Sequence, residues 1–217
     1  MFVGHYAASL TLKSFENRVS LGVLFLAVQF VDILFFPFVL AGIERMNIVE
    51  NFTQSTHFEL EYMPFTHGLL SSVLWAVAAY GVFRWVVVKK QSVAVVVALA
   101  VLSHWLLDLP VHTPDLPLWS DTSPKFGFGL WNNAIATYLL EAALLLFALW
   151  MYLRSTKATT AVGKYGMTVF VGVLLLINVS NIFGAPMVDT KIGLSIFALS
   201  SYFLFAAVAF WLDSKRS

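Results

Sequence analysis

Long apolar runs separated by shorter polar stretches dominate the chain. Several of these runs are long enough to cross a bilayer as helices, because about 20 mostly apolar residues span its hydrocarbon core. They cover residues 19–43, 65–88, 92–109, 128–153, 165–183 and 192–212, and the stretches 44–64 and 110–125 are expected as loops. The pattern predicts an all-α fold, a polytopic transmembrane helical bundle of about six spans.

A shorter apolar segment, residues 1–12, precedes the first span and is closed by Lys13 and Arg18. It is too short to cross the bilayer, so it predicts either an interfacial helix or a short half-helix that dips into the bundle. The run 19–43 is too long for the apolar core of a signal peptide, and it lacks an Ala-x-Ala cleavage pattern. We therefore interpret it as a retained span.

The composition is typical of a membrane protein with little material outside the bilayer. Of the 217 residues, 59% are hydrophobic and 12% charged, and the mean hydropathy is +0.82, whereas soluble domains carry about 25% charged residues. We expect a single integral-membrane domain, 1–217, in which residues 1–150 carry the chemistry and residues 151–217 form structural spans. The apolar composition makes the lipid bilayer the expected partner, and the net charge of +1 argues against nucleic acid as a partner.

Basic residues predict the orientation of the bundle. They gather before the first span, in every second loop and after the last span, whereas the alternate loops are mainly acidic. The basic clusters comprise Lys13, Arg18, Arg84, Lys89, Lys90, Arg154, Lys157, Lys164, Lys215 and Arg216. Because cytoplasmic loops are enriched in Lys and Arg, this distribution predicts that both termini are cytoplasmic.

The end of the third span carries His104 and Asp108, one helical turn apart. Residues at i and i+4 share a helix face, with side-chain bases about 6 Å apart, so the pair can hold one cation. An ionisable residue inside a membrane is costly and marks a functional site by default. This pair is therefore the strongest sign of chemistry in the chain.

Three further polar residues are expected at a similar depth. In the predicted topology Asp32 lies about 16 Å along the first span, and His104 lies about 18 Å along the third. His5 lies about 12 Å from Lys13, so a returning half-helix would present it near the same level. His67 lies in the opening residues of the second span, on the side where the third span ends. The predicted cluster is His5, Asp32, His67, His104 and Asp108.

Imidazole and carboxylate must supply the ligands of any metal, because the chain has no cysteine. The predicted set suits Zn²⁺ or another divalent first-row ion, as one or two ions with an open position for water. A shared carboxylate would hold two ions about 3.5–4 Å apart, a separation used in phosphoryl and ester hydrolysis. The duller interpretations stay open: interfacial histidines satisfied by water, an Asp32 paired with another helix, and a simple hydrogen bond between His104 and Asp108.

Other polar residues are weaker candidates. Glu141, on the fourth span, is a candidate metal ligand, general acid or base, or partner that orients a ligand histidine. His112 and Asp115 lie in the proline-broken loop after the third span. They are candidates to support a metal ligand or contact substrate, and solvated loop residues are the alternative. Asn133, near the start of the fourth span, is a candidate for the same supporting roles.

The order of these motifs resembles a family of small bacterial inner-membrane proteins. Gly4-His5, Asp32, Thr66-His67 and Ser-His-x-x-x-Asp ending at Asp108, followed by His-x-Pro-Asp ending at Asp115, carry the resemblance over residues 4–150. This YdjM-like family is described as metal-dependent hydrolases, some of them as LexA-binding. The resemblance implies a metal-dependent hydrolase of the bacterial inner membrane.

The ligand order is also similar to that of the soluble, helical zinc-dependent phospholipase C. That likeness implies that Asp32, His67, His104 and Asp108 hold one zinc ion, with Asp108 bridging to a second ion beside His5. His112 would match a further histidine of the phospholipase. The fourth span offers Asn133 and Glu141 but no second histidine, so the likeness fails at a third zinc.

We therefore expect a membrane-embedded hydrolase in which metal-bound hydroxide attacks a phosphodiester or ester, in a lipid or lipid-linked substrate, on the extracytoplasmic side. Asp32, Asp108 and Glu141 are the predicted catalytic residues. Three alternatives stay open: a haem protein with His67 and His104 as axial ligands, an ion transporter, and a protein with a structural metal. Two nearby aspartates argue against haem, and only Gln29 would extend a polar path toward the cytoplasm.

Overall fold

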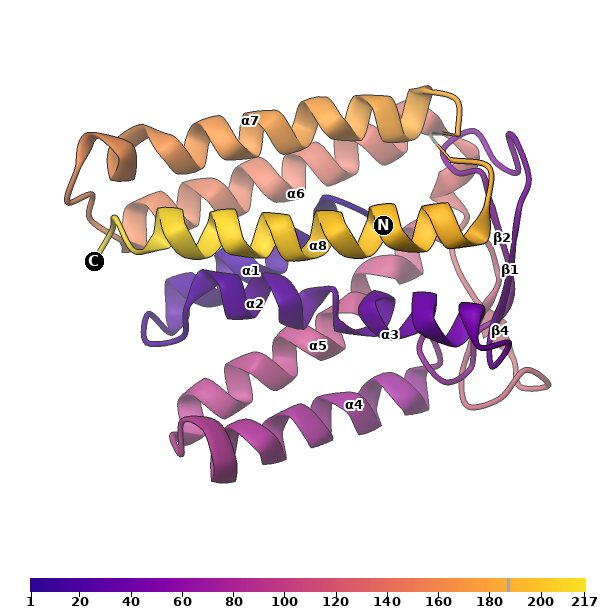
Figure 1. Cartoon of the computed structure of the whole chain (residues 1–217), viewed down its shortest axis with the longest axis horizontal. Coiled ribbons are helices and arrows are strands. Elements are labelled where there is room, and N and C mark those ends of the chain that lie inside the picture. The colour runs from indigo at the N-terminus through magenta and orange to yellow at the C-terminus, as the bar shows by residue number, and fades with distance from the viewer. Residues whose placement is uncertain (187) are drawn as a thin grey trace.

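The computed structural model describes residues 1–186 and 188–217 and is an all-α bundle (Figure 1). Its helices are α1 (Gly4–Phe15), α2 (Leu21–Val28), α3 (Phe30–Leu40), α4 (Leu69–Gly81), α5 (Gln91–Val111), α6 (Ala134–Ser155), α7 (Ala161–Phe183) and α8 (Lys191–Asp213). A π-helical segment, η1 (Val82–Val87), extends α4, and a 3-10 turn, η2 (Leu130–Asn132), precedes α6.

The expectation of about six spans agrees with this architecture. Five segments of the described chain are long and apolar enough to cross a membrane: α4 with η1, α5, α6, α7 and α8. The pair α2 and α3 supplies a sixth if it is counted as one broken span. The chain is a multi-pass membrane protein.

The first span is not the continuous helix that its apolar run predicts. Its two halves, α2 and α3, meet at Gln29 with a bend of 47°. Pro37 lies inside α3, eight residues beyond the break, so proline does not cause the bend. At the break the carbonyl oxygen of Val28 contacts Nδ1 of His104 at 2.6 Å. A side chain that takes a backbone acceptor in this way is a recognised cause of helix kinks.

The short N-terminal helix α1 lies inside the bundle, as the half-helix interpretation expected. Tyr6 and Leu10 are fully buried, and α1 packs mainly against α6 and α2. At its far end the Lys13 ammonium lies 2.9 Å from the carboxylate of Asp213 in α8. The helix is therefore fixed at this end by an ion pair as well as by apolar packing.

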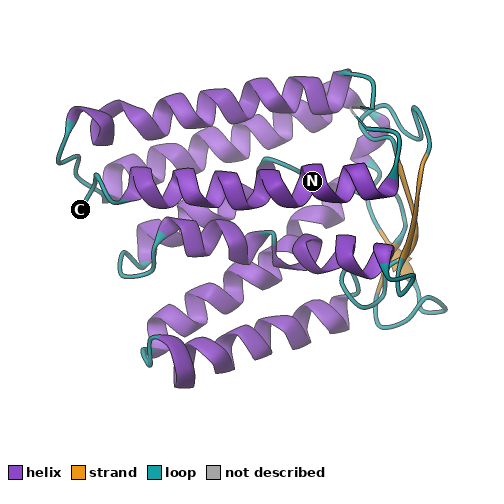
Figure 2. Cartoon of the chain, viewed as in Figure 1, coloured by secondary structure: helices purple, strands orange, loops and turns teal. Residues whose placement is uncertain are grey.

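The two stretches expected as loops contain short hairpins (Figure 2). β1 (Arg45–Ile48) pairs antiparallel with β2 (Phe58–Tyr62), and β3 (Leu116–Pro117) pairs antiparallel with β4 (Lys125–Phe126). Both lie at one end of the bundle, beside the end of α3 and the start of α8 (Figure 1). We call it the hairpin end.

Two apolar cores meet in the bundle. The main core lies among α1, α2, α5, α6, α7 and α8, and the second packs β1 and β2 onto α3, α5 and α8. Along α5, Val101 belongs to the main core and Trp105 to the second. The polar cluster begins at this junction, where His104 interrupts the apolar sequence.

Candidate metal centre

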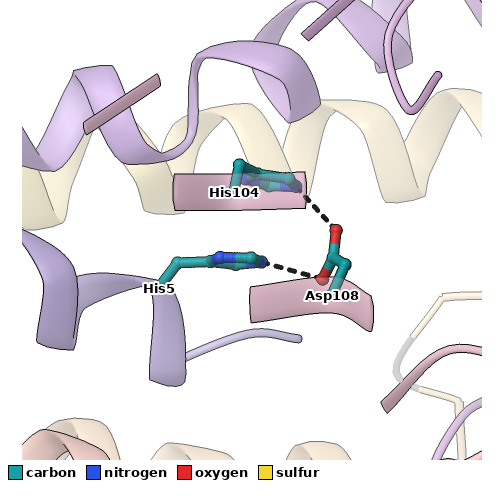
Figure 3. Close-up of side chains that lie close together, drawn as sticks. All are labelled: His5, His104 and Asp108. Carbon is teal, nitrogen blue, oxygen red and sulfur yellow. Dashed lines mark ion pairs between the residues drawn. The ribbon is translucent and has the colours of Figure 1, made fainter. Parts of the chain in front are cut away.

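His104 and Asp108 lie on one face of α5, as their spacing predicts. Nε2 of His104 is 3.1 Å from Oδ2 of Asp108, and both side chains are almost completely buried. The other oxygen of Asp108, Oδ1, lies 3.1 Å from Nε2 of His5 in α1 (Figure 3). The imidazole rings of His5 and His104 stack with centroids 3.8 Å apart. These three residues place ligand atoms within 4.8 Å of one another.

Asp32 and His67 complete the predicted set from two other segments. Asp32 projects from the first turn of α3, and His67 lies in the turn before α4. Oδ1 of Asp32 is 3.2 Å from Nε2 of His67 and 3.6 Å from Nε2 of His104. The ligand atoms of Asp32, His67 and His104 also lie within 4.8 Å of one another. All five predicted residues therefore converge.

The loop residues His112 and Asp115 belong to the same cluster. His112 follows the last residue of α5, and its Nε2 lies 3.5 Å from Oδ1 of Asp108. Its Nδ1 lies 2.8 Å from Oδ1 of Asp115. The carboxylates of Asp108 and Asp115 raise the pKa of His112 against the opposing effect of burial. His112 therefore contacts the shared carboxylate of Asp108, and Asp115 holds the opposite ring nitrogen; among the described residues neither belongs to the two groups whose ligand atoms lie within 4.8 Å of one another.

Hydrogen-bond partners define which nitrogen of two histidines faces the cluster. Nδ1 of His104 lies 2.6 Å from the Val28 carbonyl, which can only accept, so this nitrogen carries the proton. Nδ1 of His112 donates to the Asp115 carboxylate in the same way. In a neutral imidazole the lone pair is then on Nε2, the atom that faces Asp108.

A chain of hydrogen bonds from Glu44 through Thr66, which we call the relay, orients His67. Glu44 accepts hydrogen bonds from the backbone N–H of Phe65 at 2.9 Å, from the N–H of Thr66 at 3.0 Å and from the Thr66 hydroxyl at 2.7 Å. Because that hydroxyl donates to Glu44, its oxygen accepts from Nδ1 of His67 at 2.8 Å. Burial raises the pKa of Glu44, and these hydrogen bonds oppose the shift. The lone pair of His67 is thereby directed at Asp32.

The electrostatics of the cluster favour a cation. Nitrogen lone pairs face carboxylate oxygens at 3.1–3.6 Å, and two acceptors repel unless a proton or a cation lies between them. Within the described chain, both nitrogens of His5 and Oδ2 of Asp108 are buried without a hydrogen-bond partner. Each such atom costs about 1–3 kcal/mol and needs an explanation such as an ion or a water molecule. The donor set suits a divalent first-row ion.

Glu141 and Asn133 lie in other environments. Oε2 of Glu141 accepts from the backbone N–H groups of Phe2 at 3.2 Å and Gly4 at 3.0 Å, so it holds the start of α1 and thereby His5. Among the described residues Glu141 belongs to neither ligand group, and its predicted role as acid or base stays a prediction. Asn133 is exposed and caps α6 by accepting from the Ala136 N–H at 3.0 Å.

The cluster forms one side of a cavity of about 500 Å³ between α3, the β1–β2 hairpin, α7 and α8. Sequence reasoning missed two residues here. The Tyr202 hydroxyl of α8 donates to Oδ2 of Asp32 at 3.2 Å, although the span that contains it was expected to serve packing alone. Glu44 carries no signal in the sequence, because its role depends on the turn that brings Thr66 to it. The amino group of Met1 also lies 2.6 Å from Oδ1 of Asp108.

Comparison with known proteins gives no relative: no family model matches the chain, and no curated protein or solved structure is significantly similar to it.

Proposed function

We propose that this protein is a membrane-embedded, metal-dependent hydrolase. One observation carries the proposal: His67, His104 and His112 each have Nδ1 engaged by a fixed partner and Nε2 directed at Asp32 or Asp108. Metal-binding histidines are typically oriented in this way, with the second ring nitrogen donating to a carboxylate, a carbonyl or another polar group. The same pattern in three histidines, two from α5 and its C-terminal end and one from the turn before α4, favours a metal site over isolated ion pairs.

The contacts of Asp108 favour two ion positions. Its Oδ2 faces His104, and its Oδ1 faces His5, His112 and the amino group of Met1. Asp32, His67 and His104 would hold one ion, and His5 and His112 would hold the second, with Asp108 shared. Zn²⁺ is the ion that this mixture of imidazole and carboxylate ligands suits best. When bound, it supplies a water of lowered pKa and stabilises negative charge on the attacked oxygen.

The residues of the chain position and shield the reaction. Tyr202 and Asp32 are hydrogen-bonded at the edge of the cavity, so the hydroxyl orients the carboxylate. Glu141 holds α1, and thus His5, against α6. The cluster is buried below the hairpin end, and the distribution of basic residues supports an extracytoplasmic position for that end. We infer a phosphodiester or ester of a lipid or lipid-linked molecule as substrate.

The contacts disfavour two alternatives. Carboxylates lie beside the nitrogens of His67 and His104 that a haem iron would need, in space that the macrocycle would occupy. A transporter needs a polar path to the other end of the bundle. In that direction Leu10 lies five residues beyond His5 and Leu24 eight residues from Asp32, and both leucines are fully buried.

Metal analysis with a hydrolysis assay tests the proposal. Wild-type protein in lipid nanodiscs, exposed to Zn²⁺ and desalted, should retain one or two ions per chain and cleave a p-nitrophenyl phosphodiester. His104→Ala and Asp108→Asn should lose both properties. Asp121→Asn is the matched control, because the Asp121 carboxylate pairs with Lys125 at 2.7 Å, away from both ligand groups and from the cavity lining. A folded wild type that retains no ion would refute the proposal.

A further inference from the structure

The cavity beside the cluster has one polar side and a largely apolar wall. The polar side consists of Asp32, Asp108 and the histidines described above. The apolar wall is formed by side chains of α3, β1 and α8, including Phe35, Phe36, Met46, Leu194, Phe197 and Phe205. A volume of about 500 Å³ lies within the range of sites for small organic ligands, about 300–1,000 Å³. A ligand that fills it must be polar at one end and apolar over most of its length.

The cavity reaches the outer surface between α7 and α8. Phe197 lines the cavity and is also 43% exposed, and Ser180 of α7 is both lining and exposed. The neighbouring α8 residue Ile196, which does not line the cavity, is 61% exposed. Phe197 lies about 9 Å along α8 from Lys191, where the helix begins. This opening therefore faces the hydrocarbon region of the bilayer, below the end of the helix.

The hairpin covers the cavity at its end of the bundle. Thr56, His57 and Phe58 line it, and His57 ties the hairpin to the connection after α7 through the Gly184 carbonyl. The backbone N–H of Asn51 donates to Nδ1 of the same ring at 2.9 Å, which fixes the ring in place. A ligand carrying a hydrocarbon chain would thus enter more easily from the lipid side than from water.

We propose that the substrate is an amphiphile with one long hydrocarbon chain and a phosphate ester head group, taken laterally from the bilayer between α7 and α8. The inference rests on the proposed function. The head group reaches the His/Asp cluster, and the chain lies along the aromatic and aliphatic wall of α3 and α8. The phosphate follows from the shared carboxylate Asp108, because paired divalent ions are suited to phosphate oxygens.

Photo-crosslinking tests this assignment. The probe is an n-alkyl phosphonate with a terminal diazirine, added to metal-loaded protein in nanodiscs, with a non-photoreactive alkyl phosphonate as competitor. Competed label should appear on cavity residues of α3 and α8, such as Phe36 and Leu194. In Ala198→Trp, where indole fills the cavity, apparent affinity should fall about 15-fold if two methylene groups are displaced, at about 0.8 kcal/mol each.

Ile196→Trp is the matched control, because it adds the same side chain to the lipid-facing side of α8 and should label like wild type. If Ala198→Trp does not fold, Ala198→Leu should give a smaller loss in the same direction. Metal content is measured on every preparation. Bound ion with only diffuse, uncompeted label on lipid-facing side chains would overturn this inference and leave the hydrolase proposal intact. Competed cavity label on wild type that holds no ion would reject the hydrolase proposal, and with it the phosphate ester, and would leave only the lateral entry of an alkyl chain.

Discussion

Replacing Thr66 by valine removes the hydroxyl that joins Glu44 to His67 and keeps the shape of the side chain. The hydroxyl is buried, donates to Glu44 at 2.7 Å and lies 2.8 Å from Nδ1 of His67. A hydrogen bond to a charged group contributes about 1.5–3 kcal/mol, so the free energy of unfolding should fall by about that amount. Zn²⁺ affinity should fall by about 10–100-fold, because partners that orient metal ligands have effects of this size.

The assay is competition for Zn²⁺ with a chelating dye, with thermal unfolding measured on the same samples. Thr66→Ser keeps the hydroxyl and should restore most of the Zn²⁺ affinity. Thr137→Val is the matched control: Thr137 is equally buried, and its hydroxyl donates to the Leu130 carbonyl at 2.8 Å, outside the ligand groups. The control should lose stability and keep its affinity. If Thr66→Val binds Zn²⁺ within about twofold of wild type, the relay does not orient His67.

Two further predictions concern the ends of α1. Glu141→Leu leaves the N–H groups of Phe2 and Gly4 unpaired, so thermal denaturation should show a loss of about 1–3 kcal/mol for each, whereas Glu141→Gln keeps an acceptor and should be milder; equal stability of the two variants would contradict this role. At the other end, hydrogen bonding by Arg18 lowers the pKa of Glu16 from 4.5 to about 2. The ionised carboxylate therefore contributes stability that is complete above pH 4.5 and lost as the pH falls toward 2. Unfolding temperatures measured over this range should fall more steeply for wild type than for Glu16→Gln, and parallel curves would refute the pairing.

Much of the cluster could be predicted from spacing and depth alone. His104 and Asp108 are one turn apart on α5, and a helix of that length must place them on one face. The rise per residue of a helix predicts that Asp32 lies at about the same depth in the bundle as His104. The two residues do meet, even though the span that carries Asp32 is bent. The bend itself had no signal, because Gln29 lies within an apolar run without a nearby glycine or proline that breaks the helix. It depends on the contact between Val28 and His104, which only the fold creates.

The sequence of the β1–β2 hairpin contains a strand pattern, although the stretch 44–64 is expected as a loop. Residues 58–62 alternate Phe, Glu, Leu, Glu and Tyr, the period of a strand with two different faces. The sequence contains no signal for the role of Tyr202. A tyrosine in an apolar span that contacts a polar cluster has the same sequence pattern as a tyrosine that only packs. The contact of Tyr202 with Asp32 joins residues 170 positions apart and arises from the packing of α8 against α3.

Anomalous scattering at the zinc edge, from crystals of the protein grown with Zn²⁺, tests the central claim most directly. We predict a peak bounded by Asp32, His67 and His104, and a second peak beside Asp108, with ligand atoms about 2.0–2.2 Å from each ion. An ordered cluster without a peak, in which Nε2 atoms and carboxylates remain in direct contact, would contradict the account.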